Sequence, residues 1–379
     1  MMKTRAVSLI VVVVLLFSTL AVSVVGASSS PKTITVPDDY ETIHEAIDAA
    51  NNGDTIAVTA GTYNEDWVSV NKSVSVVGDN QKTVLHYHSS LGFVVTADNV
   101  HINGFTVTGS EATQGYAISV SGAKGCVITH NQLTDNHVGI SIYGNSSGNT
   151  VSENIVTHNN RSIELINAHN NMVTENNITN ALISGISLDE STGNTLSKNR
   201  ISELADGMGA LMLWESLDNT VTKNLLYNGT ISVLVGCTGN TISENYFIES
   251  NYGIYVGESS GNKFYHNYFL DVVQPVLDSQ TSADLFSENS WDNGIEGNYW
   301  SQYNGTDNDD NGIGDSIYSL YGNNQDNFPL MDFPAVSTDP DATIKPSSAE
   351  SSLPAEVIIG IAVIATIICI VAAIKLWKK

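Results

Sequence analysis

The chain has 379 residues, of which 42% are hydrophobic and only 15% are charged, and its formal net charge is −25. This length and apolar content are enough for a folded core, whereas the surface must rely mainly on uncharged polar groups. The acidity argues against nucleic-acid binding, which requires cations that displace phosphate counterions. It also disfavours unaided docking of acidic polysaccharides, and it favours a surface that attracts divalent cations.

The first segment of the chain, residues 1–27, has the pattern of a secretory signal peptide. Lys3 and Arg5 supply its positive charge, Leu9–Leu16 is its apolar run, and Val25-Gly26-Ala27 is a cleavage site of small residues. An uncleaved anchor helix is the alternative interpretation. In both cases we expect the body of the protein to be exported.

The segment DDYETIHEAIDAANNGD at residues 38–54 predicts a short helix. Its apolar residues recur at intervals of three and four and share one helical face: Ile43, Ala46, Ile47 and Ala50. Asp38 or Asp39 can cap the start of this helix, and Asn52-Gly53 can end it. We expect it to cover the first coil of a repeat domain, and we assign both to residues 28–290.

The central part of the chain repeats a phrase that is rich in Gly and Asn. It reads GNTVSEN at 148–154, GNTLSKN at 193–199 and GNTISEN at 239–245. Aligned on the last Asn, the series is Asn131, Asn154, Asn176, Asn199, Asn224, Asn245 and Asn267, with spacings by subtraction of 23, 22, 23, 25, 21 and 22 residues. Each repeat also contains a short alternating apolar stretch, such as GISI at 139–142. This pattern predicts an all-β parallel β-helix, a solenoid of coils of about 22 residues.

The repeated Asn is expected to have a structural role. Equivalent residues of successive coils lie about 4.8 Å apart, so identical side chains form a ladder along the axis. Asn at a turn can adopt a left-handed backbone conformation, and stacked Asn amides can hydrogen-bond to one another. The Gly at the start of the phrase permits a positive φ. Cys126 and Cys237 lie five coils apart (Asn131 to Asn245), so we do not expect a disulfide between them.

Residues 291–333 form the predicted C-terminal cap segment, which contains the acidic stretch TDNDDNGIGD at 306–315. This stretch matches positions 1, 3, 5, 7 and 9 of a calcium loop, with a glycine at position 6. The predicted ligands are Asp307, Asp309, Asn311, Ile313 through its carbonyl oxygen, and Asp315. Position 12 is Tyr318 instead of the usual glutamate. The alternative is an Asp- and Gly-rich turn that only caps the β-helix.

The end of the chain has the features of a membrane anchor. Residues 334–355 form a Pro- and Ser-rich linker, residues 356–376 an apolar transmembrane helix, and residues 377–379 a basic cytoplasmic tail. A buried helix of a soluble domain is the alternative. The arrangement predicts a single-pass protein of the cell membrane with its β-helix domain extracellular or periplasmic. Six N-x-S/T glycosylation sequons begin at Asn71, Asn145, Asn160, Asn177, Asn228 and Asn304.

Two segments resemble a known family. VPDDYETIHEAIDAANNGDTIAVTAGTYNE (36–65) is similar to the opening of right-handed β-helix proteins of the pectin-lyase-like superfamily. GNYWSQYNGTDNDDNGIGDSIYSLYGNNQDNFPLMD (297–332) resembles the C-terminal segment of NosD-like proteins, which occur in copper-enzyme maturation systems and on archaeal cell surfaces. The resemblance covers roughly residues 33–333 and implies a right-handed, exported β-helix. It implies no reaction, because the superfamily includes both enzymes and non-enzymes.

The residues themselves give little support for a metal centre or a catalytic set. Among the scattered histidines, only His86-x-His88 has the spacing of metal ligands, so copper is implied by the family resemblance alone. The residues before the ladder asparagines form a row of changing charge, in which Glu153 and Glu175 lie one coil apart and could share a cation. The body of the protein has only two arginines, Arg161 and Arg200, and no catalytic motif of the pectin-degrading enzymes.

From these observations we predict a membrane-anchored extracellular β-helix surface protein that binds glycans or neighbouring envelope proteins without catalysis. The first alternative is a NosD-type accessory role in copper-enzyme maturation, and the second is a polysaccharide lyase or hydrolase. The expected cofactor is calcium, and copper follows only from the family. We expect membrane attachment through the C-terminal helix and no nucleic-acid partner.

Overall fold

The computed structural model describes five stretches of the chain, residues 30–80, 82–109, 115–205, 209–279 and 288–333. The chain divides into the units Met1–Lys32 and Thr33–Lys379, and every helix and strand described lies in the second. The predicted signal peptide, linker, transmembrane helix and cytoplasmic tail fall outside the described stretches. Within those stretches, no helix has the length and hydrophobicity needed to cross a lipid bilayer.

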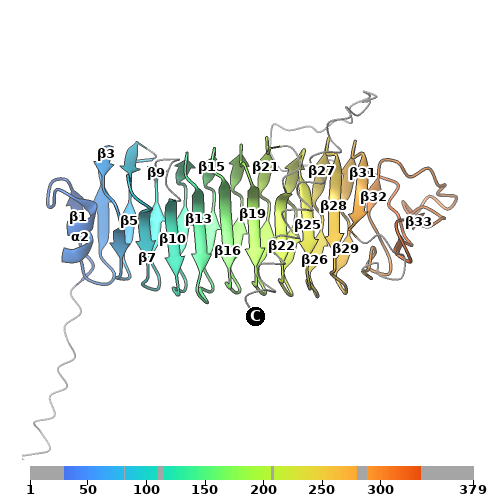
Figure 1. Ribbon diagram of the computed structural model, residues 1–379, viewed down its shortest axis with the longest axis horizontal. Helices are drawn as coiled ribbons and strands as arrows, with labels where there is room; N and C mark the ends of the chain where they lie inside the picture. The colour runs from blue at the N-terminus through green and yellow to red at the C-terminus, as the bar shows by residue number, and fades with distance from the viewer. Residues whose placement is uncertain (1–29, 81, 110–114, 206–208, 280–287, 334–379) are drawn as a thin grey trace, which may run out of the picture. The chain divides into compact units, whose positions relative to one another are not determined.

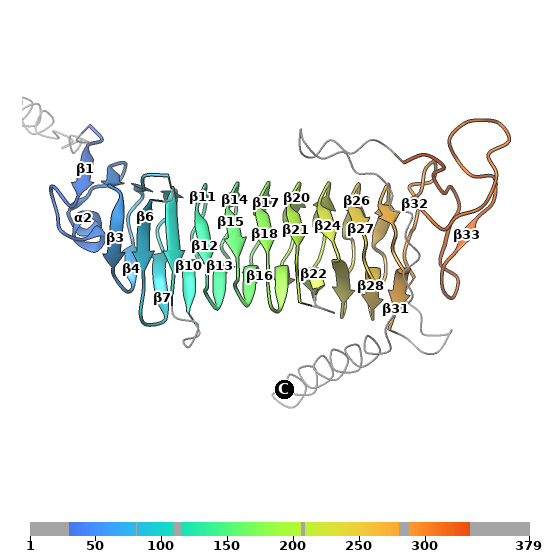
Figure 2. The same ribbon diagram turned by 90° about the horizontal axis from the view of Figure 1, so that it is seen from above.

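Three parallel sheets, here named A, B and C, form the faces of a coiled chain, and each complete coil adds one strand to each sheet (Figures 1 and 2). Sheet A consists of β1 (Thr33–Val36), β2 (Thr55–Val58), β5 (Ser75–Val77), β8 (His101–Asn103), β11 (Val127–Thr129), β14 (Thr150–Ser152), β17 (Met172–Thr174), β20 (Thr195–Ser197), β23 (Thr220–Thr222), β26 (Thr241–Ser243) and β29 (Lys263–Tyr265). Sheet B consists of β3 (Gly61–Asn64), β6 (Thr83–His86), β9 (Phe105–Thr108), β12 (Gln132–Thr134), β15 (Ile155–Thr157), β18 (Asn177–Thr179), β21 (Arg200–Ser202), β24 (Leu225–Tyr227), β27 (Tyr246–Ile248), β30 (Tyr268–Leu270) and β32 (Tyr299–Trp300). Sheet C consists of β4 (Val68–Val70), β7 (Leu91–Val95), β10 (Tyr116–Ser121), β13 (Val138–Tyr143), β16 (Arg161–Ile166), β19 (Ser184–Asp189), β22 (Gly209–Trp214), β25 (Thr230–Leu234), β28 (Tyr252–Gly257) and β31 (Gln274–Asp278).

Inward-facing residues of successive coils lie in register and form the core. In sheet C, Ile140 pairs with Ile118 on one side and with Ile163 on the other, and all three are fully buried. The short strands alternate inward and outward, as in β14, where only Val151 is buried. The core is therefore a set of aliphatic stacks, which confirms the predicted parallel β-helix.

The structure explains five of the seven residues in the phrase GNTVSEN. Gly148 has a φ of 65° and opens the turn, Val151 lies in the core, and Glu153 has a φ of 55°. Asn149 and Asn154 are both buried. The expectation of a left-handed ladder asparagine was therefore wrong: the residue before it takes that conformation, while the asparagine side chain turns inward.

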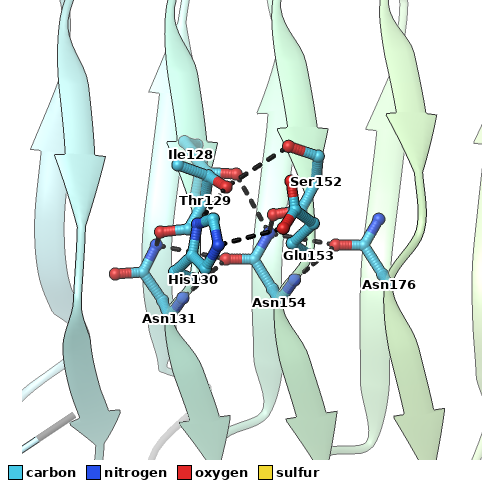
Figure 3. A network of polar contacts seen from close by, with 8 residues as sticks. All are labelled: Ile128, Thr129, His130, Asn131, Ser152, Glu153, Asn154 and Asn176. Carbon is cyan, nitrogen blue, oxygen red and sulfur yellow. Dashed lines mark hydrogen bonds and ion pairs between the residues drawn. The ribbon is translucent and has the colours of Figure 1, made fainter. Parts of the chain in front are cut away.

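Asn154 shows the hydrogen bonding that recurs from coil to coil (Figure 3). Its Nδ2 donates to the carbonyl oxygens of Ile128 and Ser152 and to Oδ1 of Asn176, each at 3.0 Å. Its Oδ1 accepts hydrogen bonds from the backbone N–H and the Nδ2 of Asn131 at 3.0 and 3.1 Å. The predicted ladder is confirmed.

The ladders extend further than the repeat series indicated. Asn267 donates to Oδ1 of Asn298, which adds one step beyond the predicted seven residues. The first Asn of the phrase forms a second ladder, which the sequence did not lead us to expect: Asn149, Asn171, Asn194, Asn219, Asn240, Asn262, Asn289 and Asn324. Cys126 donates its N–H to Asn149 of this ladder, and Cys126 and Cys237 are buried free thiols, as expected.

The N-terminal end of the β-helix is covered by α2 (Ile43–Ala49), and the predicted apolar face is buried. The helix is capped by Thr42, whose side chain accepts a hydrogen bond from the N–H of Glu45. The prediction of Asp38 or Asp39 as the cap was wrong, since Asp39 accepts the N–H of Thr35 in the strand before the helix. The helix also ends before Asn52-Gly53, at the cap residue Ala50.

Aromatic side chains close the C-terminal end of the core. Phe269 stacks on Phe247 at 4.8 Å and on Trp300 at 4.5 Å, and Tyr318 of the strand β33 (Tyr318–Ser319) stacks on Trp300 at 4.7 Å between ring centroids. The strand β33 pairs with β34 (Gln325–Asp326) in an antiparallel ribbon. These rings cover core atoms that have no further coil above them.

Asp326 ends the first asparagine ladder. Its carboxylate accepts hydrogen bonds from the backbone N–H of Asn298 at 2.7 Å and from the indole N–H of Trp300 at 2.8 Å. It also accepts the N–H of Phe328 at 3.0 Å. Burial raises the pKa of Asp326 to about 6, against the opposing effect of these N–H donors.

Candidate functional site

The corner between sheets A and B carries a row of charged side chains, which we call the corner row. At each coil the residue before the ladder asparagine adopts a φ between 54° and 59° and points outward. The corner row consists of His130, Glu153, Glu175, Lys198, Lys223, Glu244 and His266. A left-handed conformation costs a non-glycine residue about 1 kcal/mol or more, so the buried ladder behind the corner must hold the backbone in place.

The corner row is organised into pairs between neighbouring coils, and Figure 3 shows the first of them. The pairs are His130–Glu153 at 2.9 Å, Glu175–Lys198 at 3.0 Å, Lys223–Glu244 at 3.5 Å and His266–Glu296 at 2.7 Å. Glu153 and Glu175 therefore have different cationic partners, whereas the sequence suggested that they could share one. The change of sign along the row is the sequence signal of this pairing, and the side chains of the lysine–glutamate pairs remain about half exposed to solvent.

A groove of about 620 Å³ runs beside the corner row. It is lined by Glu153, Glu175, Asn176, Asn177, Lys198, Arg200, Lys223, Glu244 and Tyr246. These residues come from successive coils, so the groove crosses the strands and follows the axis of the β-helix. The side chains of the two lysine–glutamate pairs are between 43% and 58% exposed, which leaves their polar atoms accessible to a ligand.

Arg200 and Tyr246 lie on the sheet B side of the groove. The guanidinium carbon of Arg200 lies 4.7 Å from the ring centroid of Tyr227, and Arg200 forms no ion pair with the described residues. One face of the Tyr246 ring stacks on Tyr268 at 4.7 Å. Burial, followed by the nearby Glu244 carboxylate, raises the pKa of the Tyr246 phenol. The sequence drew attention to Arg200 only as one of two arginines in the body, and it placed neither Arg200 nor Tyr246 in a site, because neither belongs to the corner row.

The predicted calcium ligands lie in one exposed loop, but hydrogen bonds already engage their oxygens. Asp307 accepts the N–H groups of Asn311 at 3.1 Å and Gly312 at 2.8 Å, and these bonds lower the pKa of Asp307. Asp309 accepts the side-chain amide of Asn311. A bound calcium ion would have to compete with these contacts.

The remaining ligand positions of the loop are ordered in a similar way. Asp315 accepts both the backbone and the side-chain N–H of Asn308, at 2.9 and 2.5 Å. Ile313 forms a bridge to Leu330, which docks the loop on the C-terminal segment. Asp326 or Asp332 could replace the missing ligand at position 12, but Asp326 is buried and accepts the backbone N–H of Asn298.

The histidines do not assemble a copper site in the described stretches. The rings of His86 and His88 pack edge to face with centroids 4.5 Å apart, and no further side chain completes a set around them. Among the described residues, no group of three or more His, Cys, Asp or Glu side chains is placed to hold a metal ion.

A buried carboxyl lies on sheet C, away from the groove. Glu164 of β16 is only 6% exposed and accepts a hydrogen bond from the hydroxyl of Ser141 at 2.9 Å. Burial raises the pKa of Glu164, while Ser141 and the Arg161 guanidinium oppose the rise. The strand sequence SIEL (162–165) reads as an ordinary alternating strand, which is why the sequence did not single this residue out.

The fold and its corner define a class of protein, the right-handed parallel β-helix with a charged groove across its strands. The chain belongs to the family described as periplasmic copper-binding protein (NosD), whose model matches residues 47–236 and 233–305. This confirms the resemblance found in the sequence. The family's description as periplasmic is consistent with a β-helix domain outside the cytoplasm. None of the curated proteins matches the chain.

Solved structures with a similar fold include two lyases and DFA-IIIase. An alginate lyase from Paenibacillus sp. str. FPU-7 has a TM-score of 0.55 and 15% identity, covering 65% of this chain and 98% of that one. A mannuronic acid specific polysaccharide family 6 lyase from human gut microbiota has a TM-score of 0.54 and 15% identity, with coverages of 71% and 75%. DFA-IIIase from Arthrobacter chlorophenolicus A6, in complex with GF2, has a TM-score of 0.51 and 15% identity, with coverages of 69% and 94%. At this identity the likeness shows the fold alone.

Proposed function

We propose that this protein binds glycan chains in the groove beside the corner row, outside the cytoplasm and without cleaving them. The observation that carries the proposal is the groove itself, which presents polar side chains at the repeat of the coils, about 4.8 Å per step. A polymer of hydroxylated units can satisfy such a row of donors and acceptors along its length. Tyr246 adds to this row an apolar ring that carries a polar hydroxyl, a combination that is common at binding surfaces.

Binding without turnover is favoured by the state of the groove carboxylates. Glu175 and Glu244 are half-exposed and paired with lysines, whereas a general acid is usually buried so that its pKa rises toward neutrality. Glu164 has such an environment, but it lies on sheet C outside the groove. The carboxyl of Glu164 is therefore not placed where the groove would hold a glycan.

The experiment is a binding measurement with the full-length protein and a panel of soluble oligosaccharides, followed by calorimetry on those that bind. Tyr246→Ala should weaken binding at least about tenfold, because it removes the aromatic wall of the groove. Tyr143→Ala on sheet C is the matched control, since Tyr143 is 37% exposed outside the groove, and it should bind like the wild type. Failure of every oligosaccharide to bind, or equal losses in both variants, would refute the proposal. Shortened products after long incubation would favour the lyase or hydrolase alternative.

We also propose that the loop containing Asp307, Asp309, Asn311, Ile313 and Asp315 binds calcium, and that a C-terminal helix attaches the protein to a membrane. Support for calcium comes from four carboxylates within the nine residues 307–315, three of them at ligand positions of the loop. Support for the anchor comes from the apolar run at 356–376. A role in copper-enzyme maturation has the family description as its support.

A further inference from the structure

We infer that the glycan recognised in the groove carries carboxylate groups, as in a uronate-containing chain, and that Arg200 binds them. The inference rests on the proposed function and names the chemical class of its ligand. It reverses the expectation from net charge, which disfavoured acidic polysaccharides, because the charge of the groove differs from that of the whole chain.

Three cations and three carboxylates line the groove, so its formal charge is zero in a chain whose net charge is −25. The described stretches contain nine lysine and arginine residues in an acidic chain, and three of them, Lys198, Arg200 and Lys223, line the groove. They come from two neighbouring coils, since Lys198 precedes β21 and Lys223 precedes β24. Random placement along the β-helix would spread these cations over all its faces.

Arg200 is the cation of the groove that has no carboxylate partner among the described residues. Lys198 is paired with Glu175 and Lys223 with Glu244, so both lysines are neutralised locally. The recorded contact of the Arg200 guanidinium is the ring of Tyr227. A guanidinium presents its donors in a planar fork that matches a carboxylate bidentately, and a cation–π contact with a ring takes up none of these donors in a hydrogen bond to a side-chain acceptor.

The surroundings of Arg200 also fit a sugar ring. Arg200 is paired in register with Leu225, and Leu225 with Tyr246, so Arg200 and Tyr246 lie two strand spacings apart, about 10 Å. The buried side chain of Leu225 lies between them in sheet B. A chain lying in the groove can therefore place a carboxylate on Arg200 and a sugar ring beside Tyr246 at the same time.

The long-range charge of the protein should set the limits of this binding. The net charge of −25 repels a long polyanion, while contacts within the groove act at short range, inside a screening length of about 8 Å in physiological salt. Short acidic chains are therefore the suitable probe. Long acidic chains should bind faster as the salt concentration is raised toward the physiological value, because salt screens their repulsion by the net charge of the protein.

The test uses tetrasaccharides of galacturonate, mannuronate and guluronate, each beside the same chain with its carboxylates reduced to alcohols. At least one uronate should bind the full-length wild-type protein at least about tenfold more tightly than its reduced form. This is the difference in affinity expected from one charge-assisted bidentate contact. Arg200→Gln should abolish this preference and leave the affinity for the reduced chain within about twofold. Arg200→Lys should keep only part of it, because an ammonium group lacks the planar fork.

Arg161→Gln is the matched control, because Arg161 is the other described arginine and lies on sheet C. It should leave the preference unchanged, and circular dichroism should show all variants folded. Equal binding of each uronate and its reduced form by the wild type would overturn the inference while the proposed function stands. Absence of binding by any chain, acidic or neutral, would overturn both. An unchanged preference in Arg200→Gln would exclude Arg200 as the carboxylate-binding residue.

Discussion

At the scale of single residues, the fold depends on buried polar side chains as much as on apolar ones. Each ladder asparagine satisfies backbone groups of two coils, and an unsatisfied buried N–H or C=O costs about 1–3 kcal/mol. The ladder also holds the corner residues in a conformation that only glycine adopts freely. The charged corner row is thus presented to solvent by amides that lie directly behind it.

Asn154→Ala should lower the free energy of unfolding by about 3–5 kcal/mol. The substitution leaves the N–H of Asn131 and the carbonyl of Ile128 without their partners, and it opens a gap in the ladder. Urea unfolding followed by circular dichroism measures the loss. Asn177→Ala, at an exposed position one coil further, is the control and should change stability by less than about 0.5 kcal/mol. Similar losses in both variants would show that the ladder bonds are not the cause.

Asp326 should make the C-terminal end less stable as the pH rises. Its pKa is raised from 3.8 to about 6 in the folded chain, so the folded state binds the proton more tightly. Its contribution is complete below pH 4 and is lost as the pH passes through 6, by an amount of about 3 kcal/mol. The measurement is the unfolding free energy between pH 4 and 7 for the wild type minus that for Asp326→Asn. If the difference in unfolding free energy between the two proteins stays constant or grows with pH, the N–H donors have a larger effect on the pKa of Asp326 than burial has.

At the scale of elements, α2 is clamped at both ends by side chains of the first complete coil. The carboxylate of Glu65 accepts the N–H groups of Ile43 and His44 at 2.8 and 3.0 Å. The ammonium of Lys72 donates to the carbonyls of Ile47, Asp48 and Ala50 at the other end. A negative group at the N-terminus and a positive group at the C-terminus both match the helix dipole.

Lys72→Met should lower the free energy of unfolding by about 1–2 kcal/mol. Three carbonyls at the end of α2 lose a charged donor, while the apolar part of the side chain is kept. Hydrogen exchange in Ile43–Ala49 should accelerate, and the unfolding transition should shift to lower urea. Lys82→Met, at an exposed position, serves as the control. Unchanged exchange in the helix would show that Lys72 does not hold its end.

The loop at 306–315 gives a second test at this scale. Saturating calcium should raise the melting temperature of the wild-type protein over that in EDTA, because a ligand that binds only the folded state stabilises it. The dissociation constant should be on the order of 10⁻⁴ M, since position 12 lacks its glutamate. Asp307→Ala/Asp309→Ala should remove the shift. Equal melting temperatures of the wild type in both buffers, without calorimetric heat, would leave the loop as an acidic turn.

At the scale of the whole molecule, the fold could be predicted from the periodicity of the sequence. The groove could not, because its residues are far apart in the sequence and come together only in the folded chain. A period visible in one phrase fixes the coil length, the register and the ladder at Asn154, because every coil repeats the same local chemistry. The second ladder was visible in the same letters, but its burial depends on how the turn folds. Arg200 and Tyr246 are 46 residues apart by subtraction and line one groove only because three successive coils stack, which a single repeat does not reveal.

Removing one whole coil should leave a folded, shorter β-helix. Deletion of Glu175–Ser197 is in register, because Thr174 pairs with Ser197 and both are followed by a corner residue. Asn154 then meets Asn199, and Ile163 meets Leu211, so each ladder and each core stack continues with a residue of its own kind. Since each coil contacts mainly its neighbours, the free energy of unfolding should fall by about the contribution of one coil and its interface.

Deletion of Glu175–Ile186 is the matched control for this prediction. It joins Thr174 to Ser187 and places a strand of sheet C where a corner residue should follow, so core residues shift to the surface. Circular dichroism and protease resistance should show a cooperative fold for the whole-coil deletion and an unfolded chain for the half-coil deletion. If the two proteins behaved alike, stability would not be carried from coil to coil, and the stacked ladders could not be what positions the corner row.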